Sequence, residues 1–230
     1  MDASAEQVEV TSSGGITWLE LAAPEKVNCL SMEMIKALER AMMAASARAP
    51  VVAIRAQGRH FCAGFDVHDT TPQAPRFLRL GRLLELMREL DAITVAVVQG
   101  KAIGGGADLA CHCDIRVALA DSSFQFPGFR KFGVLLGTDR LVELAGPLHA
   151  MEALTRDRVF EVETARQVGL VDVVCESREQ ALEYVENWGS AVLDLPRASL
   201  TELISMVRGS GRPTSGLSDL ARSLVTAGLR

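Results

Sequence analysis

The sequence is built from short buried strands that end in small-residue turns and are followed by amphipathic helices. Val51–Ala56 is a continuous apolar run that ends at Gln57-Gly58, and Thr94–Val98 is a second that ends at Gly100. Apolar runs of this length, bounded by turn residues, are typical of buried strands. The repeating order of strand, loop, helix and strand places the chain in the α/β class.

Two local patterns define the elements around these strands. Apolar residues recur at helical spacing from Ser31 to about Arg48, with Ser31 as the N-cap, and again over residues 74–90. Near the N-terminus, alternating residues 7–10 and 15–21 flank Ser12-Ser13-Gly14 and predict a hairpin.

Helical patterns dominate beyond Gly137. The strand expected over Leu170–Cys175 interrupts them, and the last predicted helix covers residues 217–227. This change predicts an α/β core over residues 1–190 and a helical C-terminal region over residues 191–230.

Composition excludes several classes of function. A net charge of -5 over 230 residues leaves no basic field for nucleic acid or an anionic membrane. No apolar run approaches the roughly 20 residues of a membrane span, and the first residues lack the regions of a signal peptide. The five cysteines lack paired C-x-x-C clusters and suitably placed histidines, which indicates reduced thiols and no metal site. We therefore expect a soluble, cytoplasmic protein that acts on a small molecule.

Two small-residue turns follow strands directly and carry the clearest chemical signal. The first is Gly58–Asp66, and the second, Ala102–Leu109, contains three consecutive glycines. Gly64 tolerates backbone conformations closed to other residues, and a helix that starts at the glycine triplet adds free N–H donors. Two such turns can place two donors on one carbonyl oxygen and stabilise an enolate or a tetrahedral oxyanion. Each turn alone is also explained as a tight connection, and the spacing fits neither a dinucleotide-binding motif nor a P-loop.

Four segments together resemble the signatures of a known family. They read P-E-K-V-N-C-L at residues 24–30, F-C-A-G-F-D at residues 61–66, I-G-G-G-A-D-L-A-C-H-C-D at residues 103–114 and A-R-Q-V-G-L-V at residues 165–171. In order and spacing they resemble the enoyl-CoA hydratase/isomerase, or crotonase, superfamily. The resemblance implies a crotonase-like spiral of repeated β-β-α units, with a helical C-terminal region that serves as a lid or in trimerisation. It also implies a homotrimer or hexamer.

The same resemblance implies a ligand and individual residue roles. The ligand would be an acyl-CoA or acyl-carrier-protein thioester, with coenzyme A as the substrate carrier and no separate cofactor. In the family, the backbone N–H groups at the positions of Phe65 and Gly105 form an oxyanion hole. Ala63 corresponds to the turn that meets the adenine group, and Lys26 to a lysine near a coenzyme A phosphate.

The chain departs from the family at the catalytic acids. Family hydratases use two glutamates, and the first falls at Asp108, whose carboxylate is one methylene shorter. The second falls at Gly128 or Phe129, depending on the alignment, and neither residue is a base. Ordinary hydratase activity is therefore disfavoured, because hydration needs two acids or bases. The stretch F-R-K-F-G at residues 129–133 faintly resembles a stretch of decarboxylating members.

Histidines and one further aspartate are the remaining catalytic candidates. His68 follows the first turn and could face an acyl pocket, since imidazole is the usual general base near neutral pH. Asp139 lies near the place where dehalogenating members carry a nucleophile, but a cap or dipole partner at a helix N-terminus explains it better. Three other histidines are expected on loop or helix surfaces: His60, His112 and His149.

Several charged or polar residues near the motifs have structural explanations. Asp66 can fix its turn through its own hydrogen bonds, and Asp114 starts a strand. Cys62 is expected to be a small buried side chain without a histidine partner. A helical arginine run could meet coenzyme A phosphates but is more often a solvated face; it consists of Arg76, Arg79 and Arg82.

The leading hypothesis is an enzyme that acts on an acyl thioester through a stabilised enolate. Phe65 and Gly105 would supply the oxyanion donors and Asp108 the polar catalytic group. The reaction would be an isomerisation, a decarboxylation or a weak hydration, which makes the enzyme a lyase or an isomerase. The alternative is a catalytically weak accessory or binding subunit of a biosynthetic complex, which the missing second acid suggests.

Overall fold

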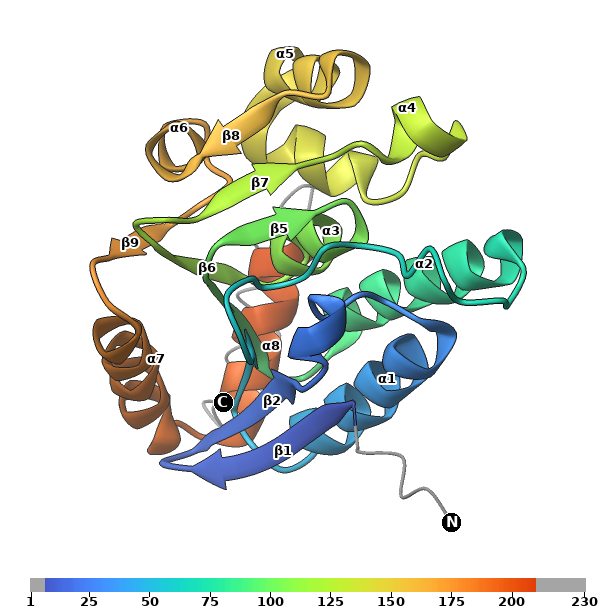
Figure 1. Ribbon diagram of the computed structural model, residues 1–230. Coiled ribbons are helices and arrows are strands. Elements are labelled where there is room, and N and C mark those ends of the chain that lie inside the picture. Colours follow the sequence, from blue (N-terminus) through green and yellow to red (C-terminus); the bar gives the residue numbers. More distant parts are fainter. Residues whose placement is uncertain (1–6, 210–230) are drawn as a thin grey trace.

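A six-stranded sheet forms the centre of the protein in the computed structural model, which describes residues 7–209 (Figure 1). Its strand order is β1-β2-β3-β4-β6-β9, with β1 antiparallel to β2 and every later pair parallel. The strands are β1 (Val8–Ser13), β2 (Ile16–Leu21), β3 (Val51–Ala56), β4 (Ile93–Val98), β6 (Ile115–Leu119) and β9 (Val173–Cys175).

The opening hairpin is confirmed. Ser13 of β1 pairs with Ile16 of β2, so Gly14 and Gly15 form a two-residue turn. Both glycines have positive φ, +55° and +79°. This is the combination that the tightest hairpin turns require, because it matches the twist of the strands.

Apolar side chains fill both faces of the sheet, which explains the continuous apolar runs in the sequence. Along β3, Val52 and Ile54 join one buried cluster, whereas Val51 and Ala53 join another on the opposite face. Helices cover the two faces separately (Figure 1). They are α1 (Met32–Ser46) and α2 (Gln73–Glu89) on the first face, and α7 (Arg178–Leu193) and α8 (Arg197–Gly209) on the second.

Helix α1 begins where its sequence predicts. The Ser31 hydroxyl accepts a hydrogen bond from the Met34 N–H at 3.1 Å, which satisfies one of the free donors of the first turn. Ile35, Leu38 and Met42 are fully buried on its inner face. The α1 prediction is confirmed.

A second, three-stranded sheet was not predicted. It consists of β5 (Lys101–Ile103), β7 (Ser123–Gln125) and β8 (Val159–Glu161) and lies at one end of the main sheet (Figure 1). Each strand has three residues, too few to establish an alternating pattern. The helices of this end are α3 (Gly105–Cys111), α4 (Gly128–Phe132), α5 (Thr138–Arg156) and α6 (Val162–Gln167), and the 3-10 turn η1 (Pro24–Lys26) follows β2.

Arg208 links α8 to the segments that precede β4 and β6. Arg208 donates hydrogen bonds to both carboxylate oxygens of Asp114, at 2.8 and 2.6 Å, and to the Ala92 carbonyl at 2.8 Å. Asp114 also accepts from the Thr94 N–H and hydroxyl, which confirms its structural role. The division near residue 190 stays a prediction, and the helix predicted over residues 217–227 lies outside the described residues.

The described residues contain neither a membrane-spanning helix nor a metal-binding cluster. Within residues 7–209, no helix is long and apolar enough to cross a membrane. In the same range, no group of three or more histidine, cysteine, aspartate or glutamate side chains could hold a metal ion. The five cysteines are free thiols, four of them buried.

Candidate active site

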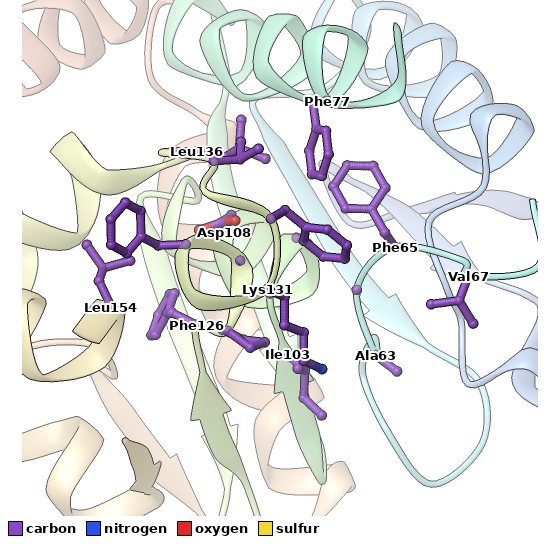
Figure 2. A pocket seen from close by; sticks show the side chains of 18 residues that line it. Ala63, Phe65, Val67, Phe77, Ile103, Asp108, Phe126, Lys131, Leu136 and Leu154 are labelled. Atoms are coloured by element: carbon purple, nitrogen blue, oxygen red, sulfur yellow. The ribbon is translucent and has the colours of Figure 1, made fainter. Parts of the chain in front are cut away.

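A cavity of about 140 Å³ lies where the two glycine turns meet α4, the segment that follows α4 and the last turn of α5 (Figure 2). Figure 2 shows the Phe65 and Phe77 rings side by side on one flank, Leu154 and Phe126 on the other, and Asp108 between the two flanks. The lining residues are Ala63, Gly64, Phe65, Val67, Phe77, Ile103, Gly104, Gly105, Asp108, Phe126, Pro127, Gly128, Phe129, Lys131, Phe132, Val134, Leu136 and Leu154.

The first turn is held in place by the segment between η1 and α1. The Ala63 N–H donates to the Val27 carbonyl at 3.1 Å, and the Leu30 N–H donates to the Gly64 carbonyl at 2.7 Å. The Asp66 N–H donates to the Leu30 carbonyl. The early segment of the family resemblance therefore positions the first turn.

The two turns touch at Gly64. Its φ is +87°, and a Cβ built there would lie 2.7 Å from the Ile103 carbonyl oxygen and 3.6 Å from the Gly105 nitrogen. A residue with a side chain would be strained by this φ and would push against the second turn. Glycine at this position thus brings Phe65 and Gly105 close together.

The Phe65 and Gly105 N–H groups donate no hydrogen bond within residues 7–209. Gly105 is the first residue of α3, so its N–H is one of the donors that a helix leaves unsatisfied. Phe65 and Gly105 both line the same largely apolar cavity. Such a pair can hydrogen-bond one oxygen that gains negative charge.

Asp108 is the only carboxylate among the described residues that line the cavity. The residue is 7% exposed, and its carboxylate makes no hydrogen bond with the described part of the chain. Burial, reinforced by the nearby Asp139 carboxylate, holds the pKa of Asp108 well above its ordinary value. The neutral, protonated form of Asp108 is therefore favoured, which suits an acid better than a base.

The two candidate positions for a second acid both lie at the cavity. Gly128 and Phe129 contribute to its wall, and a Cβ built at Gly128 would meet no atom within 4 Å. The space for a second acid therefore exists, but the side chain does not. Lys131 is the other charged residue in the described wall, and Figure 2 shows it extended along Ile103.

Comparison with known proteins identifies the family. A family model described as enoyl-CoA hydratase/isomerase matches residues 11–215, most of the chain. The chain belongs to the enoyl-CoA hydratase/isomerase family.

Relatives and a solved structure agree with this assignment. The "Probable enoyl-CoA hydratase echA6" of Mycobacterium leprae is 32% identical over 199 residues, which cover 82% of this chain and 77% of the relative. The "Ethylmalonyl-CoA decarboxylase" of Danio rerio is 31% identical over 229 residues, covering 91% and 74%. An enoyl-CoA hydratase structure from Thermoplasma volcanium has a similar fold, with a TM-score of 0.85 and 23% identity. The match covers 100% of this chain and 94% of the Thermoplasma chain. The predicted crotonase fold and an enzyme of hydratase/isomerase type are confirmed.

Of the two residues that the family resemblance assigns to coenzyme A, one lies in the cavity wall and the other lies outside it. Ala63 lines the cavity. Lys26 does not; it is exposed at the end of η1, adjacent to Val27, whose carbonyl holds Ala63. Lys26 is thus close in the chain to the first turn but outside the cavity wall.

His68 and Asp139 do not line the cavity. His68 is exposed, and its backbone N–H donates to the Asp66 carboxylate at 2.8 Å, so Asp66 ties down the turn as predicted. Asp139 lies in the first turn of α5, whose N-cap is Gly137, and it is 3.7 Å from Arg88. This position agrees with a dipole partner.

Arg76 was expected on a solvated face, and this expectation is wrong. Arg76 is buried, donates to the Asp66 carbonyl at 2.6 Å and lies over the Phe65 ring. It therefore supports the first turn from α2. Its spacing from Leu80, Leu84 and Met87 places it on the apolar stripe of α2, a signal that the sequence did contain.

His112 was expected on a surface, and this expectation is also wrong. It is the C-cap of α3 and is 7% exposed. Its Nδ1 lies 2.7 Å from the Asp108 carbonyl oxygen. Burial lowers the pKa of His112 to about 4. Every residue of α3 is buried, so this helix has no exposed face from which a surface position could be judged.

Proposed function

We propose that this protein binds an acyl thioester with the thioester carbonyl oxygen between the Phe65 and Gly105 N–H groups. The two free donors and the apolar wall support this role, because a charge that develops on that oxygen would be stabilised with little competition from water. Loss of one donor of this kind costs ~10²–10³-fold in kcat. The intermediate would be a thioester enolate.

The single protonated acid favours decarboxylation over hydration and isomerisation. Hydration needs a base and an acid, and isomerisation needs a base that removes a proton. In a decarboxylation, the bond between the α-carbon and the substrate carboxylate breaks, CO₂ leaves, and the electron pair forms the enolate. The protonated Asp108 then supplies the proton to the α-carbon and regains one from water. Relatives named ethylmalonyl-CoA decarboxylase support this choice.

The cavity suits the acyl end of a malonyl-type thioester. Its volume of about 140 Å³ is below the roughly 300–1,000 Å³ typical of sites that enclose a whole drug-sized ligand. The carrier arm would therefore run outside it, past Ala63 toward Lys26. Lys131 supplies a positive charge in the wall for an anionic group of the substrate.

The reaction is tested with purified protein and three substrate classes. We expect CO₂ release from a 2-carboxyacyl-CoA such as ethylmalonyl-CoA, and much slower turnover of crotonyl-CoA and of a β,γ-enoyl-CoA. Faster hydration or isomerisation than decarboxylation would refute the proposal. The same acyl groups on a carrier protein distinguish the two carriers.

A binding or accessory subunit is the second candidate, and the absence of a second carboxylate from the described cavity wall favours it. This candidate predicts thioester binding by calorimetry without turnover of any of the three classes. Assembly into trimers or hexamers stays a prediction that light scattering would check.

A further inference from the structure

His112 is a buried titratable group that the proposed reaction does not use. It follows Asp108 by four residues on α3, so the two side chains lie on the same face of the helix. The His112 backbone N–H and ring nitrogen Nδ1 both point to the Asp108 carbonyl oxygen, at 3.0 and 2.7 Å. The ring is thus fixed relative to the residue that carries the acid.

This contact determines the tautomer of the ring. A carbonyl oxygen can only accept, so Nδ1 must carry the hydrogen. Burial favours the neutral imidazole and lowers the pKa of His112 to about 4. The other nitrogen, Nε2, therefore presents a lone pair and no hydrogen.

The ring and the Asp108 carboxyl meet above Gly137. A Cβ built on Gly137 would lie 2.7 Å from Asp108 Oδ1 and 3.2 Å from His112 Cε1. The φ of Gly137 is +63°, so this position disfavours a side chain on conformational grounds as well. Glycine thus leaves one space that both the Asp108 carboxyl and the His112 imidazole border.

The charged groups around this space come from two other helices, and Glu143 of α5 pairs with both arginines, Arg88 at 3.5 Å and Arg140 at 2.9 Å. Asp139 and Arg140 belong to α5, and Arg88 belongs to α2. Arg88 is 3.7 Å from Asp139, and Arg140 Nε donates to the Cys111 carbonyl at 2.9 Å. No arginine or lysine pairs with the Asp108 carboxyl within residues 7–209. A neutral acid beside a neutral imidazole is the arrangement that such a buried setting tolerates.

We infer that His112 is a positioning residue, whose Nε2 accepts a hydrogen bond from the protonated Asp108 carboxyl through one bridging water molecule. This bond orients the acid and keeps its proton in place until the enolate forms. The inference rests on the proposed function, in which Asp108 protonates the α-carbon.

The kinetic test compares His112→Asn with His149→Asn. In His112→Asn, the new side-chain amide can still donate to the Asp108 carbonyl but offers nothing at the Nε2 position, whereas His149 lies on α5 beside Glu152 and outside the cavity. Because only protonated Asp108 is active, kcat/KM falls as the pH rises through its pKa. Without the acceptor, we expect this fall to move about one pH unit lower, with kcat reduced about tenfold and KM unchanged. A reduced kcat without a moved pH profile would overturn the inference, as would an equal shift in His149→Asn.

A second measurement needs no turnover. Nitrogen NMR of the wild-type protein should show His112 neutral with the hydrogen on Nδ1 at neutral pH, and Asp108→Ala should move the Nε2 resonance toward that of a free acceptor. A hydrogen on Nε2, or an Nε2 resonance unchanged in Asp108→Ala, would overturn the inference even if His112→Asn does not fold. If this pairing is seen but the wild type releases no CO₂, the proposed function fails and the pairing stands.

Discussion

Substitution of Gly64 by alanine tests whether the two turns must touch. The positive φ of +87° costs a non-glycine residue about 1–2 kcal/mol. The new Cβ would also lie 2.7 Å from the Ile103 carbonyl oxygen, which is backbone and cannot rotate away. Overpacking of this kind adds about 1–3 kcal/mol. We therefore expect Gly64→Ala to lose about 2–5 kcal/mol in free energy of unfolding and to separate the Phe65 and Gly105 donors.

Gly14→Ala is the matched control. Gly14 also has positive φ, +55°, but a Cβ there meets no atom within 4 Å, and it lies in the β1–β2 turn, remote from the cavity. Thermal unfolding should show a loss of about 1–2 kcal/mol in Gly14→Ala with unchanged turnover. Gly64→Ala should lose ~10²-fold in kcat even at a temperature where it is fully folded, since placement errors near 1 Å can cost this much. If folded Gly64→Ala keeps the wild-type rate, close contact of the turns is not what positions the donors.

Three further substitutions address the acid, the missing acid and the anchor of α8. Asp108→Asn keeps the size of the side chain but cannot donate an acidic proton, so kcat should fall ~10²–10⁴-fold with little change in KM; an unchanged kcat would remove Asp108 from its role. Gly128→Glu places a carboxylate where a Cβ meets nothing within 4 Å, so stability should change by less than about 0.5 kcal/mol while crotonyl-CoA hydration rises. A stable variant without added hydration would show that a second acid at this position is insufficient. Arg208→Met removes the partner of Asp114 and should cost about 3–5 kcal/mol by urea unfolding at neutral pH. Burial raises the pKa of Asp114, but hydrogen bonds from Arg208 outweigh this effect and hold the pKa below its ordinary value. The stability that Arg208→Met loses should therefore shrink as the pH falls through the lowered pKa of Asp114. A stability loss that is independent of pH would contradict this account.

The sequence predicts the elements whose periodic pattern lies within one continuous segment and extends over enough residues to be recognised. Strand β3 and helix α1 each carry a pattern that their own residues complete, and Ser31 marks the start of the helix. Strand β5 has three residues and begins with an exposed lysine, Lys101. It exists because it pairs with β7, a contact across the chain that no window of sequence contains.

For the candidate site, the sequence indicates three residues of the cavity wall but not the buried histidine beside them. Phe65, Gly105 and Asp108 all line the cavity, because their turns follow strands whose ends lie together. His112 could not be assigned, since its burial depends on α5, which begins more than 20 residues later in the sequence. A histidine four residues after an acid on a short helix gives no sign of which helix covers it.

The groups that can take or give a proton limit which reaction this cavity can perform. In the proposed mechanism, the Phe65 and Gly105 N–H groups would stabilise an enolate whatever reaction produced it, so they do not distinguish one family reaction from another. The distinction comes from the groups that take or give a proton, and Asp108 is the only carboxylate in the described wall, in a setting that favours its protonated form. A reaction that begins by removing a proton from carbon would have to ionise Asp108 first, against its burial. Loss of CO₂ generates the same enolate without a base, after which a protonated acid is what the next step requires.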